Sequence, residues 1–201
     1  MINTKKSTLA IFDFDGTITK KDTLNDLIMK EFGYIKFLGY ILILSPLILL
    51  YKLGFLANHI PKGMLFSKFF SGMEYPRFKE ICQKYASCQI DSIVRTEAKE
   101  KIKWHHKEGH NLIIITASVG NWIEPWAAKN NINEVISTQI EVIDGKLTGK
   151  FFTKNCYGSE KVKRLLEKYP NRDNYIIYAY GDSLGDKDLL KIADYPFFKS
   201  F

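Results

Sequence analysis

Residues 8–17 read TLAIFDFDGT. The first seven form a short apolar run that ends in acids, which is typical of a buried strand. Asp13 and Asp15 stand two residues apart, so both can face one pocket if the chain leaves strand geometry there. Gly16 permits a tight turn and a close approach of backbone N–H groups to an anion. The stretch predicts a polar site at a strand end, and a strand ending in an Asx turn is the alternative.

Strand-like and helical patterns alternate along the rest of the chain. Core strands are predicted at residues 8–14, 111–116 and 175–180. Helices are predicted at 121–130 and at 159–169, the latter with Ser159 as its N-cap. Shorter strands are predicted at 135–142 and 146–152, joined by a turn at Asp144-Gly145, and at 195–198. Such alternation predicts an α/β fold, with a Rossmann-like parallel sheet and helices on both of its faces.

A basic and apolar segment interrupts this pattern. A helix is predicted at 22–32 with Asp22 as N-cap, more helices at 61–87, and a long polar helix at 90–108. Residues 37–51 contain no charge, and Glu31 is the sole acid from 27 to 73, against five lysines. We interpret the segment as a small helical cap inserted after the first strand. The predicted domains are a cap of residues 21–94 and a core of residues 1–20 and 95–201.

The uncharged run of residues 37–51 allows two interpretations. Its fifteen residues fall short of the roughly 20 that span a bilayer, and Pro46 should kink or end a helix. Two packed cap helices would explain it. An interfacial or re-entrant membrane anchor would explain it equally, because the neighbouring lysines suit an anionic lipid surface.

Composition narrows the function classes. The chain has 201 residues and a net charge of +7, carried mostly by lysine, with only four arginines, so nucleic-acid binding is not expected. Three cysteines without a C-x-x-C pair predict free thiols in a cytoplasmic protein, and no signal peptide is expected. His105, His106 and His110 cluster near a helix end, but we do not expect a metal site there.

Three more elements can contribute to the site that Asp13 and Asp15 begin. Thr116 ends the second core strand, where its hydroxyl and the N–H groups of Ala117 and Ser118 can donate to a phosphoryl oxygen. Lys161 lies in the first turn of a helix, where acids are favoured, and this violation indicates a charge-offsetting role. Residues 181–186 read GDSLGD, an acidic loop after the third strand.

These residue types suit phosphoryl chemistry. One carboxylate of an aspartate pair can attack phosphorus, while the other protonates the leaving oxygen and then deprotonates a water. Asp182 offers the hard oxygen ligand that Mg²⁺ prefers, and Asp186 can ligate directly or hold Asp182 in place.

In this order, the four elements resemble the haloacid dehalogenase superfamily of phosphohydrolases, in its phosphoserine-phosphatase-like branch (subfamily IB). The resemblance implies Asp13 as nucleophile and Asp15 as general acid/base. It implies Thr116 and Lys161 as partners of phosphate and nucleophile, with Asp186 in a supporting shell. Magnesium ligands are implied at Asp13, Asp182 and the backbone carbonyl of Asp15. Further phosphate contacts are expected at Gly16, Thr17, Ala117, Ser118 and Gly185.

The chain departs from true phosphoserine phosphatases at three points. It has Asp22 where they have glutamate, no arginine before Arg77 to hold a serine carboxylate, and Gly185 where they have asparagine. The apolar cap and the stretches 137–140 and 156–162 look more similar to phosphatidylglycerophosphatase C, which acts on a lipid phosphate.

We therefore expect a Mg²⁺-dependent hydrolase of a small-molecule or lipid phosphomonoester. The lipid alternative adds peripheral contact with the inner face of the membrane. A catalytically inactive phosphate- or membrane-binding module is the alternative of another class. The sequence leaves the leaving group and the oligomeric state open.

Overall fold

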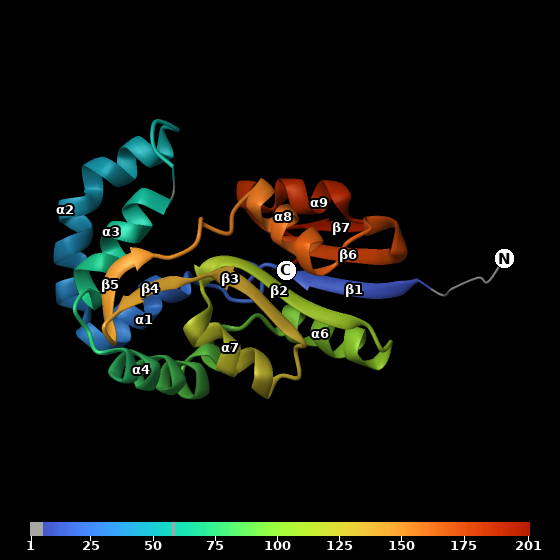
Figure 1. The fold of residues 1–201 in the computed structure, drawn as a ribbon, viewed down its shortest axis with the longest axis horizontal. Helices are drawn as coiled ribbons and strands as arrows, with labels where there is room; N and C mark the ends of the chain where they lie inside the picture. The colour runs from blue at the N-terminus through green and yellow to red at the C-terminus, as the bar shows by residue number, and fades with distance from the viewer. Residues whose placement is uncertain (1–5, 58) are drawn as a thin grey trace.

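The computed structural model of the protein describes residues 6–57 and 59–201, and its main feature is a parallel sheet of five strands (Figure 1). In sheet order the strands are β3 (Glu134–Thr138), β2 (Asn111–Val119), β1 (Ser7–Phe12), β6 (Tyr175–Gly181) and β7 (Tyr195–Phe198). The predicted α/β fold is confirmed. Residues 1–5, on which the signal-peptide prediction and part of the predicted core rest, lie outside the described residues, as does residue 58 of the predicted cap.

The central strand β1 is buried on both faces. Ala10 and Phe12 point into one apolar cluster, which includes side chains of α6 (Thr96–Lys107) and α7 (Gly120–Lys129). Leu9 and Ile11 point into the other, with side chains of α8 (Ser159–Lys168) and α9 (Lys187–Ile192). Helices therefore cover both faces of the sheet, which explains why β1 reads as a continuous apolar run rather than an alternating one.

In the described part of the chain, five helices lie between β1 and α6, the helix that leads into β2. They are α1 (Thr23–Phe32), α2 (Tyr34–Lys52), α3 (His59–Phe70), α4 (Tyr75–Cys88) and α5 (Ile90–Ile93). The single helix predicted at 90–108 is wrong, because Val94 is extended and separates α5 from α6. Val94 pairs with Thr19, and the Arg95 N–H donates to the Ile18 carbonyl at 2.9 Å. The chain thus leaves and re-enters the sheet region along adjacent paths.

An antiparallel hairpin, β4 (Ile140–Ile143) and β5 (Lys146–Phe151), stands apart from the main sheet. Its predicted turn is confirmed, with Asp144 and Gly145 both at positive φ. The hairpin packs on α3 so closely that a Cβ on Gly149 would lie 2.7 Å from the Ser67 hydroxyl oxygen. The domain limits remain a prediction, and this hairpin of the predicted core range contacts the predicted cap (Figure 1).

Helix α2 continues through Pro46, so of the two predicted effects of this proline, a kink or a helix end, the helix end is wrong. Proline lacks the N–H that would bond the Leu42 carbonyl. The Ser45 hydroxyl donates to that carbonyl instead, at 2.7 Å, and so replaces the missing donor. Of the described helices, α2 alone is long and apolar enough to cross a membrane, by length and composition. Core helices and signal sequences can pass the same test.

The start of α8 also differs from the prediction. Gly158, at φ 59°, is its N-cap, and Ser159 is the first helical residue. The predicted Ser159 cap is therefore displaced by one residue. This shift matters little for the site, because Lys161 still lies in the first turn of the helix.

Candidate active site

Residues from three neighbouring strands meet at the carboxyl edge of the sheet. Asp13 follows β1, Thr116 lies in β2, and Asp182 follows β6. They line a cavity of about 460 Å³ together with Asp15 and Lys161. The Asp13 N–H donates to the Tyr180 carbonyl at 2.9 Å, which fixes the end of β1 against β6. The parallel sheet therefore brings together residues far apart in sequence.

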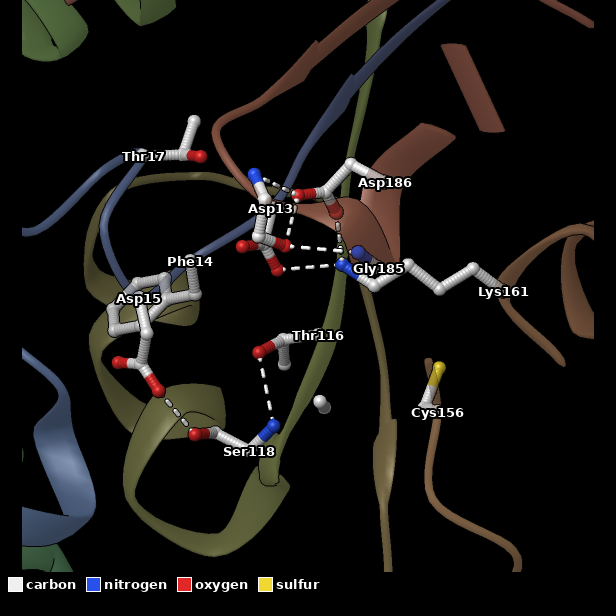
Figure 2. A network of polar contacts seen from close by, with 12 residues as sticks. Asp13, Phe14, Asp15, Thr17, Thr116, Ser118, Cys156, Lys161, Gly185 and Asp186 are labelled. Atoms are coloured by element: carbon white, nitrogen blue, oxygen red, sulfur yellow. Dashed lines mark hydrogen bonds and ion pairs between the residues drawn. The ribbon is translucent and has the colours of Figure 1, made fainter. Parts of the chain in front are cut away.

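Lys161 bridges two buried carboxylates (Figure 2). Its Nζ donates to Asp13 Oδ1 at 2.7 Å and to Asp186 Oδ1 at 2.6 Å. The Lys161 side chain is only 2% exposed. Burial opposes its charge, yet the two carboxylates outweigh that effect and raise the pKa of Lys161. Burial also raises the pKa of Asp13 to about 7, and Lys161 partly offsets this rise.

Asp186 holds the loop that carries Asp182. Its Oδ2 accepts from the Ser183 hydroxyl at 2.8 Å, from the Ser183 N–H at 3.0 Å and from the Asp182 N–H at 3.2 Å. Asp186 is fully buried, and a Cβ on Gly181 would lie 2.4 Å from the Cβ of Asp186. These contacts hold the loop that carries Asp182, and the choice between direct ligation and support by Asp186 stays a prediction.

Asp15 also lines the cavity. Its carboxylate accepts from the Thr23 N–H at 2.9 Å and from the Ser118 hydroxyl (Figure 2). Desolvation raises the pKa of Asp15 to about 6, with a further contribution from the charge of Asp22. A carboxyl with this pKa can hold a proton near neutral pH and release it to a leaving group.

The predicted phosphate donors from β2 are arranged differently from expectation. Thr116 is buried, and its Oγ1 accepts from the Ser118 N–H at 3.1 Å. That N–H is therefore engaged within β2, while the Ser118 hydroxyl contacts Asp15. Ala117 and Ser118 both line the cavity. Their predicted phosphate contacts remain predictions.

The glycine and threonine of the first motif pack against the Asp182 side chain. Gly16 has φ +85°, and a Cβ there would lie 2.4 Å from Asp182 Oδ2. Thr17 Oγ1 donates to Asp182 Oδ1 at 3.2 Å. Gly185 instead lies beneath the Tyr157 ring, which a Cβ would meet at 2.4 Å. The predicted phosphate contacts of these three residues remain predictions.

Residues 10–191 match the family of haloacid dehalogenase-like hydrolases. The chain belongs to this family. The superfamily prediction made from the four motifs is confirmed, and with it the prediction of an enzyme of the hydrolase class.

Relatives extend over nearly the whole chain of this hydrolase. Protein CicA of Caulobacter vibrioides is 29% identical over 96% of this chain and 86% of its own. A protein of unknown function from Bordetella pertussis Tohama I has a similar structure, with a TM-score of 0.79 at 19% identity, covering 93% of this chain and 87% of that one. The structure of a phospho-aspartyl intermediate analogue of phosphoserine phosphatase is also similar, with a TM-score of 0.62 at 20% identity. The match covers 94% of this chain and 84% of that one. The fold of the predicted branch is therefore confirmed.

The hydrolase has a cluster of acids that fits the Mg²⁺ expected for its family. Asp13, Asp182 and Asp186 each offer an oxygen within 4.8 Å of the others. Lys161 balances only one of these charges, and burial together with Asp186 raises the pKa of Asp182. A divalent cation would offset the remaining charge, and oxygen ligands are those that Mg²⁺ prefers. Because Asp186 is occupied by Lys161 and Ser183, Asp13 and Asp182 suit direct ligation better.

Sequence reasoning missed Lys62 as a candidate site residue. Lys62 comes from α3, lines the catalytic cavity and donates from Nζ to the Ser118 hydroxyl at 3.0 Å. It also lies 3.9 Å from Asp22 Oδ2. Five lysines occur between residues 27 and 73, and nothing in the sequence marks this one. Its position at the cavity follows only from the packing of α3 in the folded protein.

Proposed function

We propose that this hydrolase is a Mg²⁺-dependent phosphatase of phosphomonoesters that acts through an aspartyl-phosphate on Asp13. The observation that carries the proposal is the Lys161 ammonium group, buried between Asp13 and Asp186 in the catalytic cavity. Such a lysine keeps the Asp13 carboxylate oriented and offsets charge that gathers on a transferring phosphoryl group.

Two carboxylates divide the chemistry. Asp13 attacks phosphorus, and the proton of Asp15 goes to the oxygen of the departing alcohol. Asp15 then accepts a proton from the water that attacks the phosphorus of the aspartyl-phosphate, which restores Asp13 and releases phosphate. When bound by Asp13 and Asp182, Mg²⁺ supplies positive charge beside the phosphoryl oxygens. Asp186 and Lys161 keep the ligands and the nucleophile in place.

The test is release of phosphate from p-nitrophenyl phosphate by wild type and by Asp13→Asn. We expect turnover with Mg²⁺, none after EDTA treatment, and none in Asp13→Asn, because an amide does not attack phosphorus. Beryllofluoride should form an adduct on Asp13 in the wild type. Near-normal turnover by a folded Asp13→Asn variant, or by metal-free wild type, would exclude this mechanism. A folded wild type without turnover would favour the inactive phosphate- or membrane-binding module.

A second candidate function is the hydrolysis of a lipid phosphate at a membrane surface, and α2 favours it. Only 6% of an apolar stretch of 18 residues in this helix is buried, and Ile35 and Ile43 are 86% and 70% exposed. Such an exposed apolar helix is unusual in a globular protein. Lysines at both ends of the helix, Lys36 and Lys52, suit an anionic bilayer. Co-sedimentation with anionic vesicles tests this candidate.

A further inference from the structure

A second and larger cavity opens beside the catalytic one. Its volume is about 1220 Å³, and it lies between the end of α2, α3, β5 and the start of α8. Pockets for small molecules usually measure roughly 300–1,000 Å³. This cavity therefore exceeds what a leaving group as small as serine needs.

The two cavities adjoin each other. Tyr51, Tyr157 and Leu184 line both of them. Tyr157 comes from the loop before α8, and its ring lies against Gly185 of the acidic loop. Tyr51 belongs to the last turn of α2, so predicted cap and predicted core meet at this junction. A phosphomonoester with its phosphate at Asp13 would place its leaving group past these side chains into the larger cavity.

The walls of the larger cavity combine apolar and cationic side chains. Ile60 and Met64 of α3 face it together with Phe151 of β5 and Leu56. Lys52, Lys150 and Lys154 also line it. Among residues 6–57 and 59–201 these three lysines form no ion pair, and Glu160, the acid in the wall, is paired with Arg164 at 2.9 Å. The cavity thus offers apolar contact together with uncompensated positive charge.

We infer that this cavity binds the leaving group of the substrate, and that the substrate is an amphiphilic phosphomonoester whose alcohol carries a long apolar portion and a further anionic group. The inference rests on the proposed phosphatase function and names the substrate class of the same site. A short polar alcohol would leave the apolar walls in contact with water. An apolar chain without a second anion would leave the lysines unpaired.

Four synthetic substrates separate these contributions: butane-1,4-diyl bisphosphate, decane-1,10-diyl bisphosphate, decyl phosphate and p-nitrophenyl phosphate, all used as monomers. Each methylene buried is worth about fourfold in affinity. We expect kcat/KM for the ten-carbon bisphosphate to exceed that for the four-carbon bisphosphate by at least about tenfold, because several methylenes reach the walls. The kcat/KM for decyl phosphate should lie between the values for the two bisphosphates. Equal values for the two bisphosphates would overturn the inference.

Two variants locate the effect. Lys150→Gln with Lys154→Gln should lower kcat/KM for the ten-carbon bisphosphate about tenfold and leave decyl phosphate and p-nitrophenyl phosphate within about twofold. The matched control, Lys103→Gln with Lys107→Gln on α6, changes the net charge equally and should change none of these values. Gly63→Leu narrows the cavity from α3, where a Cβ would meet only Phe151, at 3.6 Å. This variant should lower turnover of the two ten-carbon substrates and leave turnover of the other two substrates unchanged.

The outcomes distinguish this inference from the proposed function. If the variants lower kcat/KM equally for all substrates, or for none of them, the cavity does not select the leaving group. The phosphatase assignment stands in that case. If no substrate is turned over, the phosphatase assignment fails, and calorimetry with the non-cleavable decane-1,10-diyl bisphosphonate then tests the cavity directly. Binding that the lysine double variant weakens supports the cavity, and no binding overturns it. Comparing decyl phosphate as monomer and within anionic phosphatidylglycerol vesicles separates a soluble amphiphile from a membrane lipid.

Discussion

Lys161 Nζ lies 2.7 Å from Asp13 Oδ1, although 148 residues separate the two in sequence. A helix that begins after the hairpin thus supplies the cation for a carboxylate at the end of the first strand. Both side chains are buried, so solvent screens their attraction poorly. The same ammonium group contacts Asp186, which makes Lys161 the link between the nucleophile and the loop that carries Asp182.

Replacing Lys161 by methionine should destabilise the protein as well as inactivate it. Removal of one partner from a buried ion pair leaves uncompensated charge and costs about 3–5 kcal/mol of unfolding free energy. Urea unfolding monitored by circular dichroism measures this loss. Lys163→Met on the same helix is the control, because its partner Glu167 and Lys163 itself are both exposed, and it should cost less than about 1 kcal/mol. Equal, small losses in the two variants would contradict the central role of Lys161.

Asp15 should set the upper limit of the pH range for substrates with poor leaving groups. Its pKa of about 6 means that the protonated acid declines above that pH, so kcat/KM should fall as pH rises. Asp15→Asn should lower the rate by roughly 10²–10⁴, the range for a positioned acid. The loss should be smaller for p-nitrophenyl phosphate, whose leaving group needs little protonation. Equal losses for good and poor leaving groups would refute the assignment of Asp15.

Two neighbours should move this pH limit in opposite directions. The Lys62 cation lowers the pKa of Asp15, so Lys62→Met should shift the falling limb of the profile to higher pH. The Asp22 anion raises that pKa, so Asp22→Asn should shift the limb to lower pH. Asparagine still caps α1, where Asp22 accepts from the Asn25 N–H at 2.9 Å, so folding is retained. Shifts of the same sign in both variants would show that Asp15 does not control the limb.

His105 should make the protein less stable in mild acid. The ring is fully buried, bonded to the Tyr180 hydroxyl at 2.9 Å and to His110 Nδ1 at 2.7 Å. Burial lowers the pKa of His105 to about 3, so between pH 6.5 and 3 the unfolded chain binds a proton that the folded chain does not. This contribution to unfolding free energy therefore falls by about 1.4 kcal/mol per pH unit as pH drops through that window.

The check on His105 is a comparison of wild type with His105→Gln in urea unfolding at pH 7.5, 5.5 and 4.5. Other groups titrate over the same range, so only the difference between the two proteins reports on His105. We expect the wild type to lose stability relative to the variant as the pH falls. A difference that is independent of pH would contradict a neutral, buried His105.

Sequence patterns located much of the site because they depend on local features. The apolar run before Asp13 and the run before Asp182 predict strand ends, and parallel strands bring such ends to one edge. Lys161 was recognisable because its charge opposes the helix dipole. Lys62 and Tyr157 had no such local mark. Their place in the site depends on how α3 and the loop before α8 pack in the folded protein, which is a tertiary property.

Helix α2 exposes a different limit of sequence reasoning. Its residues are apolar on every side, so no periodicity indicates which face is buried. In the structure Leu44 is 1% exposed, whereas its neighbour Ile43 is 70% exposed. The helix does not end at Pro46, one of the two effects expected of this proline, because the Ser45 hydroxyl satisfies the Leu42 carbonyl. Such a compensation involves one side-chain rotamer and cannot be read from composition.

That pair of neighbours gives a sharp test of membrane contact. If the exposed face of α2 lies on an anionic bilayer, wild type should sediment with phosphatidylglycerol vesicles. Ile43→Asp should reduce the bound fraction. It should not change the stability measured by urea unfolding, because most of the Ile43 side chain is exposed. Leu44→Asp places a charge in the apolar core instead, so it should lower the unfolding free energy by several kcal/mol. High salt should weaken binding, since lysines near the surface contribute about 1 kcal/mol each. Wild type that stays in the supernatant with anionic vesicles at low salt would leave α2 without a membrane role, while the phosphatase chemistry at Asp13 would be unaffected.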